Sequence, residues 1–387
     1  MMPISTSFGS PAMRNERFAR HRLIDWFSQD RVSSTSCAVI GTGAVGNEVL
    51  KCLTLLGVKL IDVYDLDKVE EHNLTRSVFF RDSDIGLSKA DVAAKRALQL
   101  NPDTRVNAIN GDIRDTLSLT QLSRYDMTFA CVDNFEARIY LNQMCRLLGV
   151  PLTNIGIDAR FVSVELYPFD RGPSSACYEC GLPPSVYSRI AERYSCGWLR
   201  RVGLVERKIP TTIVAASIAG AMAVSQALRF GSDADGSASR RRLMDTLSGS
   251  TTDAMIPKRD DCPCCGRLKH PVLTVTIGNM LDRCSSLSSG AAPKSITVRL
   301  SEPVIFGVRC SHCGYDDTAQ HGLRKARDQD SRLRTCPVCG SDAIVDVRDE
   351  LTLTELVRDY RSAAIPVGYI LVDAAFGTMA LDLGSKA

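Results

Sequence analysis

The sequence has 387 residues, of which 44% are hydrophobic and 24% charged, and its formal net charge is only +3 at pH 7. This length allows two domains, the composition is that of a globular protein, and so small a charge gives no general argument for nucleic-acid binding. Eight of the fifteen cysteines fall in four C-x-x-C pairs, which favours metal binding in a reducing compartment over a secreted disulfide framework. Because residues 1–15 contain no apolar signal-peptide core, we expect a cytoplasmic protein.

Strand and helix patterns alternate through the first 150 residues. In chain order we expect helix 17–31, strand 37–40, helix 47–56, strand 60–64, helix 90–100, strand 105–109, strand 127–132 and helix 137–148. Alternation at these lengths predicts an α/β fold with a Rossmann-like, mostly parallel sheet that is covered by helices on both faces.

Residues 213–230 are strongly apolar, so a membrane-spanning helix is one interpretation of this stretch. It is shorter than the roughly 20 apolar residues that a span needs, and Ser217, Ser225 and Gln226 interrupt it. We therefore expect a buried core helix and no membrane partner.

Two polar connectors follow, at residues 231–239 and 285–294. The second is rich in serine, glycine and proline and is the expected boundary between a large domain, residues 1–284, and a C-terminal module, residues 295–387. Within the module we expect helix 351–360 and strands 370–373 and 378–383.

A glycine-rich turn joins the first predicted strand to its helix. The turn contains Gly41, Gly43 and Gly46, which would let the backbone approach a phosphate at a helix N-terminus. Asp65, at the end of the next strand, could accept a hydrogen bond from a ribose hydroxyl. This pattern fits an NAD enzyme as well as an ATP enzyme, and a glycine turn without any ligand is also compatible with it.

The residues after Asp65 favour ATP. Arg76 and Lys89 are cations that could stabilise charge on phosphate when a carboxylate displaces pyrophosphate, whereas an NAD dehydrogenase has no use for them. Asp133 ends a later strand, at the sheet edge where ligands bind in open α/β folds, and could hold Mg²⁺. Each of these three charged residues alone could be a solvated surface residue, but their combined placement favours a binding site for ATP and Mg²⁺.

Four motifs give the chain a family resemblance: G-T-G-A-V-G, D-L-D-K-V-E-E-H-N-L-T-R, D-I-G-L-S-K and V-D-N-F-E-A-R. From about residue 20 to residue 230 the sequence resembles the ThiF/MoeB and ubiquitin-activating-enzyme superfamily. The resemblance implies that the residues that bind ATP or Mg²⁺ are Asp65, Asn73, Arg76, Lys89 and Asp133, and we add Asp67 of the same run to the nucleotide site. It also implies a homodimer in which Arg20 reaches the partner's nucleotide.

The first set of cysteine pairs predicts a structural zinc site. Cys177 and Cys180 form one C-x-x-C pair, and Cys262 and Cys265 form another about eighty residues later. The resembled family has a structural zinc in this arrangement. Cys264 could replace Cys265 as a ligand, although the spacing and the following glycine favour Cys265.

Cys196 is the candidate nucleophile. Arginines flank it on both sides and would favour its thiolate, which could take an activated acyl group from AMP to form a thioester. In the resembled family this crossover segment often carries the reactive cysteine. The alternative is a structural or non-essential cysteine in a loop.

The C-terminal module carries a second zinc signature, a ribbon with the four cysteines Cys310, Cys313, Cys336 and Cys339. Basic residues between the two pairs keep nucleic acid open as a partner, but nearby acids and the lack of interleaved aromatic residues count against it. We interpret the module as a docking platform for a ubiquitin-like protein or a conjugating enzyme.

Three functions compete, of which the resemblance implies the first two and the third belongs to a different class, a binding scaffold. The preferred one is ATP-dependent adenylation of the C-terminal glycine carboxylate of a ubiquitin-like protein, followed by thioester transfer to Cys196 for delivery to a conjugating enzyme. The second is a sulfur-carrier adenylyltransferase without its own thioester step. The third is a zinc-ribbon scaffold with a degenerate nucleotide fold.

Overall fold

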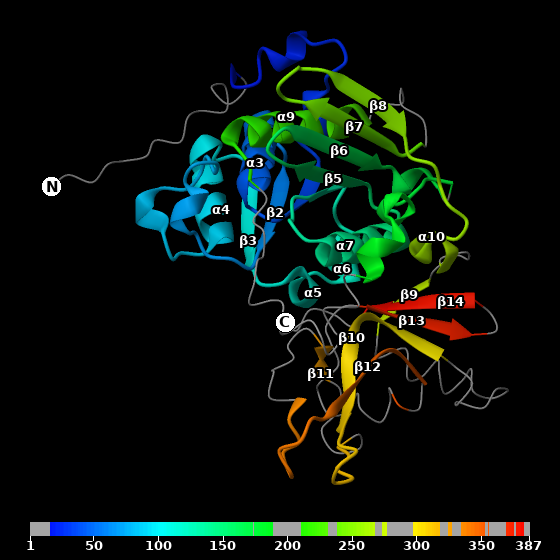
Figure 1. The fold of residues 1–387 in the computed structure, drawn as a ribbon. Coiled ribbons are helices and arrows are strands. Elements are labelled where there is room, and N and C mark those ends of the chain that lie inside the picture. The colour runs from blue at the N-terminus through cyan, green and yellow to red at the C-terminus, as the bar shows by residue number, and fades with distance from the viewer. Residues whose placement is uncertain are drawn as a thin grey trace.

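In the part of the chain that the structure describes, the strands form two β-sheets, one of eight strands and one of six (Figure 1). The computed structural model describes residues 16–172, 174–188, 210–230, 238–267, 273–276, 297–317, 324–326, 334–352, 355, 369–374 and 377–382. Both sheets and all contacts below lie within these ranges.

The large sheet has the strand order β3-β2-β1-β4-β5-β6-β7-β8. Its strands are β1 (Ser36–Ile40), β2 (Leu60–Asp65), β3 (Arg105–Asn110), β4 (Met127–Ala130), β5 (Leu152–Ile157), β6 (Phe161–Tyr167), β7 (Arg240–Asp245) and β8 (Thr251–Met255). The first five strands in this order are parallel, and the last three continue the sheet antiparallel. The predicted α/β fold with a mostly parallel sheet is therefore confirmed.

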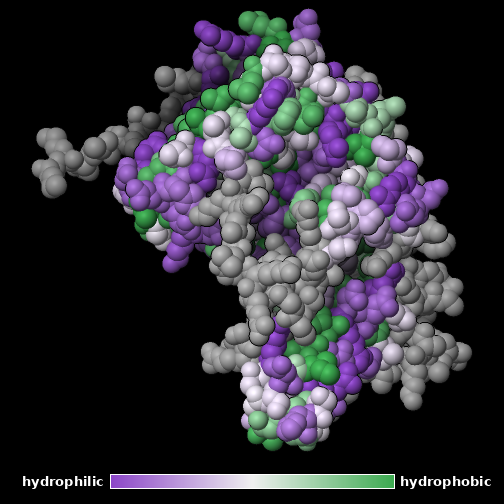
Figure 2. Space-filling model, in the orientation of Figure 1, coloured by the Kyte–Doolittle hydropathy of each residue, from purple (hydrophilic) through white to green (hydrophobic). Residues whose placement is uncertain are grey.

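Helices cover both faces of this sheet, as the fully buried residues of β1 require. One face packs against α3 (Ala44–Leu56), α4 (Lys89–Leu100) and α9 (Ile213–Phe230), and the other packs against α5 (Ile113–Thr116), α6 (Leu119–Leu122) and α7 (Phe135–Leu148). Hydrophilic side chains gather over the outer side of α4 in Figure 2, opposite its buried alanines.

Short helical turns connect these elements or lie beside the cysteine pairs. They are the 3₁₀ turns η1 (His21–Leu23), η2 (Glu71–Asn73), η3 (Asp82–Asp84), η4 (Phe169–Arg171) and η5 (Tyr178–Gly181), and the short helices α2 (Gln29–Val32) and α10 (Pro263–Arg267).

The order of strands reverses at β1, which has β2 on one side and β4 on the other. The connection after β1 enters α3 on one face of the sheet, and the connection after β4 enters α7 on the other. The two connections therefore leave the carboxyl edge of the sheet toward opposite faces, and this switch point is where open α/β sheets bind ligands.

The apolar helix α9 is a core helix that packs on α3, β5 and β6. The two helices pack tightly at Gly220, where an added Cβ would lie 2.5 Å from Cβ of Glu48 on α3. Within the described residues, the helices lack the length and apolar character that crossing a membrane requires.

The smaller sheet contains β9 (Leu273–Thr276), β10 (Thr297–Arg309), β11 (Arg324–Lys325), β12 (Ile344–Thr352), β13 (Tyr369–Ala374) and β14 (Gly377–Asp382). β13 and β14 confirm the two predicted strands 370–373 and 378–383, and they pair with each other antiparallel. β9 joins the sheet by parallel pairing with β14, so the second sheet includes residues that lie before the expected boundary segment. Residues 285–294 themselves lie outside the described ranges.

One aromatic side chain connects the two sheets. Tyr369 on β13 is buried among the residues that also line α7, its ring lies 5.9 Å from the ring of Tyr140, and its hydroxyl donates to Oε1 of Gln143 at 2.9 Å. The small sheet is thus held against the α7 side of the large one.

The predicted helix 17–31 is wrong, because this segment folds as η1, a bend and α2. Phe18 packs on the turn at the end of α3, where an added Cβ at Gly57 would lie 2.4 Å from its ring. Nδ1 of His21 lies 2.7 Å from Oε1 of Gln29, which also bends the chain back on itself. Contacts with α3 and within the segment replace a continuous helix.

The predicted helix 351–360 is wrong at its start. Leu351 and Thr352 belong to β12 and pair with β10, opposite Val298 and Thr297. Cross-strand pairing and the burial of Leu351 therefore override the helical pattern at these two residues. Glu355 is helical and its backbone donates to Oγ1 of Thr352 at 3.3 Å, while residues 353–354 and 356–360 lie outside the described ranges.

The contact at Gly220 gives a testable prediction. We expect Gly220→Ala to destabilise the protein by about 1–3 kcal/mol, because the methyl group overlaps α3 and the helices must separate. The measurement is the shift in the urea unfolding midpoint. The matched control is Gly156→Ala, since an added Cβ at Gly156 meets nothing within 4 Å. Equal midpoints for the two variants would contradict the close packing of α3 and α9.

Candidate nucleotide and metal sites

The three glycines after β1 have three different surroundings. Gly41 has a φ of 90°, and an added Cβ there would lie 2.8 Å from the carbonyl oxygen of Cys131. An added Cβ at Gly46 would lie 1.9 Å from the carbonyl oxygen of Gly41. At Gly43 it would meet nothing within 4 Å, so the backbone at the start of α3 is open to a ligand. Two glycines are therefore needed by the turn itself, and the third leaves a helix N-terminus accessible to an anion.

Asn47 holds the turn in place and was missed by the sequence reasoning. Its side chain is fully buried, its amide nitrogen donates to the carbonyls of Thr42 and Gly43, and its amide oxygen accepts from the backbone of Phe79 at 2.9 Å. A polar residue one position after the last glycine was visible, but its partner Phe79 is distant in sequence.

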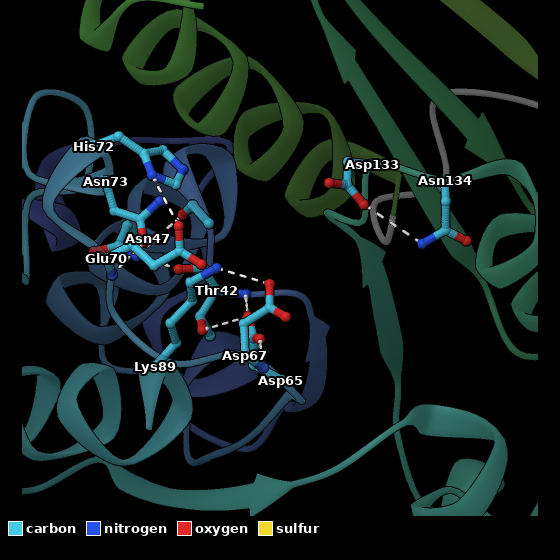
Figure 3. A network of polar contacts seen from close by, with 11 residues as sticks. Thr42, Asn47, Asp65, Asp67, Glu70, His72, Asn73, Lys89, Asp133 and Asn134 are labelled. Carbon is cyan, nitrogen blue, oxygen red and sulfur yellow. Dashed lines mark hydrogen bonds and ion pairs between the residues drawn. The ribbon is translucent and has the colours of Figure 1, made fainter. Parts of the chain in front are cut away.

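Asp65 closes the turn from the end of β2. One carboxylate oxygen accepts hydrogen bonds from the backbone and hydroxyl of Thr42 at 2.6 and 2.7 Å, and the other accepts from the backbone of Asp67 at 2.8 Å. The predicted ribose acid thus lies beside the glycine turn and also orders it (Figure 3).

Lys89 lies next to these acids. It is the first residue of α4, its side chain is 11% exposed, and its Nζ lies 2.8 Å from a carboxylate oxygen of Asp67, which is 56% exposed. The fold therefore brings Asp65, Asp67 and Lys89 into one cluster, as the sequence predicted (Figure 3).

Asn73 and Arg76 occupy the neighbouring turn. Asn73 is buried, and its side-chain oxygen accepts from the backbone of Glu70 at 2.9 Å, which makes it a capping residue of η2. Arg76 donates to the carbonyl of His72 at 2.6 Å and is half-buried. Both residues lie on the segment of chain between the two acids and Lys89.

Asp133 lies apart from this cluster, after β4 and before α7 (Figure 3). Its carboxylate is exposed, and its hydrogen bond from the side-chain amide of Asn134 is long, at 3.4 Å. Carboxylate oxygens in such surroundings remain available to a hard cation such as Mg²⁺, so the residue fits the predicted role.

The remaining catalytic candidates are Arg20 and Cys196. Arg20 is exposed in the segment before η1, and Cys196 lies outside the described residues. Burial raises the pKa of the thiols of Cys131 and Cys145 to about 12 and raises that of Cys37 further. These three cysteines are therefore poor nucleophiles.

The first cysteine cluster has the geometry of a zinc site. The Sγ–Sγ distances are 3.9 Å for Cys177–Cys180, 3.6 Å for Cys177–Cys262 and 3.8 Å for Cys180–Cys265, and all four residues are buried. A tetrahedron with Zn–S bonds of about 2.3 Å has edges of roughly 3.8 Å. Cys265 belongs to this four-residue cluster and Cys264 does not, so the geometry favours Cys265 as the fourth ligand.

The second cluster lies in the small sheet and joins the four ribbon cysteines, Cys310, Cys313, Cys336 and Cys339. The Sγ atoms of Cys310 and Cys339 are 3.6 Å apart, and those of Cys313 and Cys336 are 3.5 Å apart. A hydrogen bond from Ser341 lowers the pKa of Cys339 to about 6, which favours the thiolate that zinc requires. A complete four-sulfur set is typical of structural zinc.

Comparison with known proteins gives one family match. A model of the ThiF family matches residues 16–264 of the chain. The ubiquitin-like modifier-activating enzyme 5 of Bombyx mori is 33% identical over 195 residues, which are 48% of this chain and 48% of that protein. Its namesake from Oryza sativa subsp. japonica is 30% identical over 236 residues, 57% of this chain and 54% of that protein. The chain thus spans about half the length of these curated relatives.

A solved structure shares the fold. The crystal structure of E. coli MccB with ATP matches with a TM-score of 0.53 at 22% identity, over 65% of this chain and 75% of that one. Likeness at this level of identity concerns the architecture alone.

The zinc ligands give a testable prediction. We expect Cys265→Ser to lower the zinc content from two ions per chain to one, because it removes one corner of the first tetrahedron, while Cys264→Ser retains both ions. Metal analysis of the purified variants by mass spectrometry is the measurement. Loss of zinc in Cys264→Ser with retention in Cys265→Ser would reverse the ligand assignment.

Proposed function

Because the chain belongs to the ThiF family, we propose that it uses ATP to adenylate the C-terminal glycine carboxylate of a ubiquitin-like protein. The observation that carries this proposal is the open helix N-terminus at Gly43, next to a cluster in which Lys89 lies against Asp67. An anion-binding backbone and a nearby fixed cation are the features that phosphate chemistry needs. The curated relatives named as activating enzymes for ubiquitin-like modifiers supply the substrate class.

The reaction needs little covalent chemistry from the protein. An oxygen of the substrate carboxylate attacks the α-phosphorus of ATP, the bond to the β-phosphate oxygen breaks, and pyrophosphate leaves. Lys89 and Arg76 stabilise the charge that grows on the phosphates, while Asp65 orients the ribose. Asp133 would hold Mg²⁺, which neutralises phosphate charge when bound.

We further propose a thioester step on Cys196. Its thiolate attacks the carbonyl carbon of the acyl-adenylate, AMP leaves, and the acyl group is then passed to a conjugating enzyme. The arginines around Cys196 in the sequence support this choice, as do the raised pKa values of the buried cysteines described above.

The assembly is proposed on the same basis. Arg20 is exposed on the segment before η1 and would complete the nucleotide site of a second copy of the chain, which makes the working unit a homodimer. The second cysteine cluster would bind zinc and stiffen a platform for the modifier or the conjugating enzyme.

Lys89 tests the adenylation step. We expect Lys89→Ala to slow ATP–pyrophosphate exchange, measured with a candidate ubiquitin-like protein ending in glycine, by roughly 10²–10³-fold, since a fixed charge at the phosphates is lost. Lys59→Ala is the control, because Lys59 precedes β2 and lies at the opposite edge of the sheet. An equal rate for both variants would exclude Lys89 from the phosphate site.

Cys196 tests the thioester step. The protein is incubated with the modifier, ATP and Mg²⁺ without reductant, and its intact mass is then measured. The wild-type chain is expected to gain the modifier's mass, and Cys196→Ala is not. The control is Cys284→Ala, which removes another cysteine outside the two zinc sets and should gain the mass like the wild type. The adduct should disappear with added thiol. Pyrophosphate release without any adduct would contradict the thioester step and leave an adenylyltransferase of the sulfur-carrier type.

A further inference from the structure

A row of polar side chains crosses three neighbouring strands of the large sheet, buried on the first two strands and exposed on the third, where it ends in a 44% exposed arginine. Asn154 on β5 lies directly opposite Glu165 on β6, which lies directly opposite Arg241 on β7. The amide of Asn154 donates to Oε2 of Glu165 at 2.7 Å, and Nε of Arg241 donates to Oε1 at 2.6 Å. Asn154 and Glu165 are each 5% exposed. Polar groups at this depth are stable only as a connected set.

Arg138 on α7 extends the row to the carboxyl edge of the sheet. Its guanidinium donates to the side-chain oxygen of Asn154 and to the backbone carbonyls of Val132 and Ile155, the last at 2.8 Å. Val132 immediately precedes Asp133, whose carboxylate lies at this turn in Figure 3. One guanidinium therefore ties the turn between β4 and α7 to the polar row.

The other end of the row lies against the first cysteine cluster. An added Cβ at Gly181 would be 3.3 Å from Nη2 of Arg241, and Gly181 directly follows the cluster residue Cys180. The four side chains, which we call the polar relay, are Arg138, Asn154, Glu165 and Arg241. They connect the turn of the first cysteine cluster to the turn that carries Asp133.

The charges of the polar relay depend on one another. Glu165 is a buried carboxylate whose charged partner is Arg241, and its second oxygen also accepts from the hydroxyl of Tyr167 at 2.9 Å. Loss of Arg241 leaves the buried carboxylate of Glu165 without its charged partner, so the hydrogen bond that it accepts from Asn154 is weakened and the contact between Asn154 and Arg138 is weakened with it.

We propose that the polar relay positions the turn between β4 and α7, so that the first cysteine cluster fixes the location of Asp133. Its members are positioning residues and do not contact the substrate. The role of Asp133 as the cation ligand rests on the proposed function, whereas the mechanical coupling does not.

The test compares two adjacent arginines of β7. Arg241→Gln removes the end of the relay, and Arg242→Gln is the matched control, because Arg242 pairs with Asp253 on the edge strand β8. Hydrogen–deuterium exchange of a peptide covering residues 130–137 is expected to be roughly fivefold faster in Arg241→Gln, the effect of weakening one hydrogen bond, and unchanged in the control. Arg241→Lys, which keeps the charge, should restore part of the protection.

A second measurement addresses the site itself. In ATP–pyrophosphate exchange, Arg241→Gln is expected to need roughly fivefold more Mg²⁺ for half-maximal rate, with the KM for the ubiquitin-like protein unchanged. A general loss of folding would instead change both the Mg²⁺ requirement and the KM for the ubiquitin-like protein.

The outcomes separate the relay from the proposed function. Equal amide exchange at residues 130–137 in Arg241→Gln and Arg242→Gln overturns the relay. Loss of zinc from Arg241→Gln also overturns it, because the faster exchange would then come from collapse of the first cysteine cluster. Faster exchange at the turn in a protein that shows no pyrophosphate exchange even as wild type supports the relay and refutes the adenylation proposal.

Discussion

The backbone contact between Gly41 and Cys131 is the constraint on which the site depends. It brings the connection after β1 against the connection after β4 with no space for a side chain between them. Because β1 lies between β2 and β4, these connections leave the sheet toward opposite faces, one into α3 and the other into α7. Thr42 of the glycine turn lies with Asp65, Asp67 and Lys89 on the α3 side, and Asp133 lies apart from them, at the start of the connection to α7 (Figure 3).

Much of this arrangement was predictable because the signals are local. Strand lengths, the glycine turn, the acid at the end of β2 and the paired cysteines each occupy a few consecutive residues. Parallel pairing then brings the carboxyl ends of β1, β2 and β4 to one edge, as the alternation of strands and helices indicates. The cluster of Asp65, Asp67 and Lys89 follows from that edge, and so does the position of Asp133.

The parts that were missed or wrong depend on contacts between distant segments. Asn47 takes its role from Phe79, and the residues of the polar relay come from a helix and three strands that no local pattern connects. The segment 17–31 has helical spacing, but contact of Phe18 with the end of α3 decides its path. Leu351 likewise lies in a strand because β10 is available to pair with it. Propensity is a weak guide wherever tertiary contacts compete with it.

The parallel pairing of β9 with β14 has a consequence for how the chain reaches this structure. β9 precedes β10 to β13 in the sequence, yet its partner strand is formed by residues 377–382. During synthesis β9 therefore emerges long before the strand that completes it, and its unpaired edge is exposed while the ribbon cysteines are being made. A pairing of such high sequence separation forms slowly, so the small sheet is expected to close after the large one and to be the part of the molecule most in need of protection from aggregation as it folds.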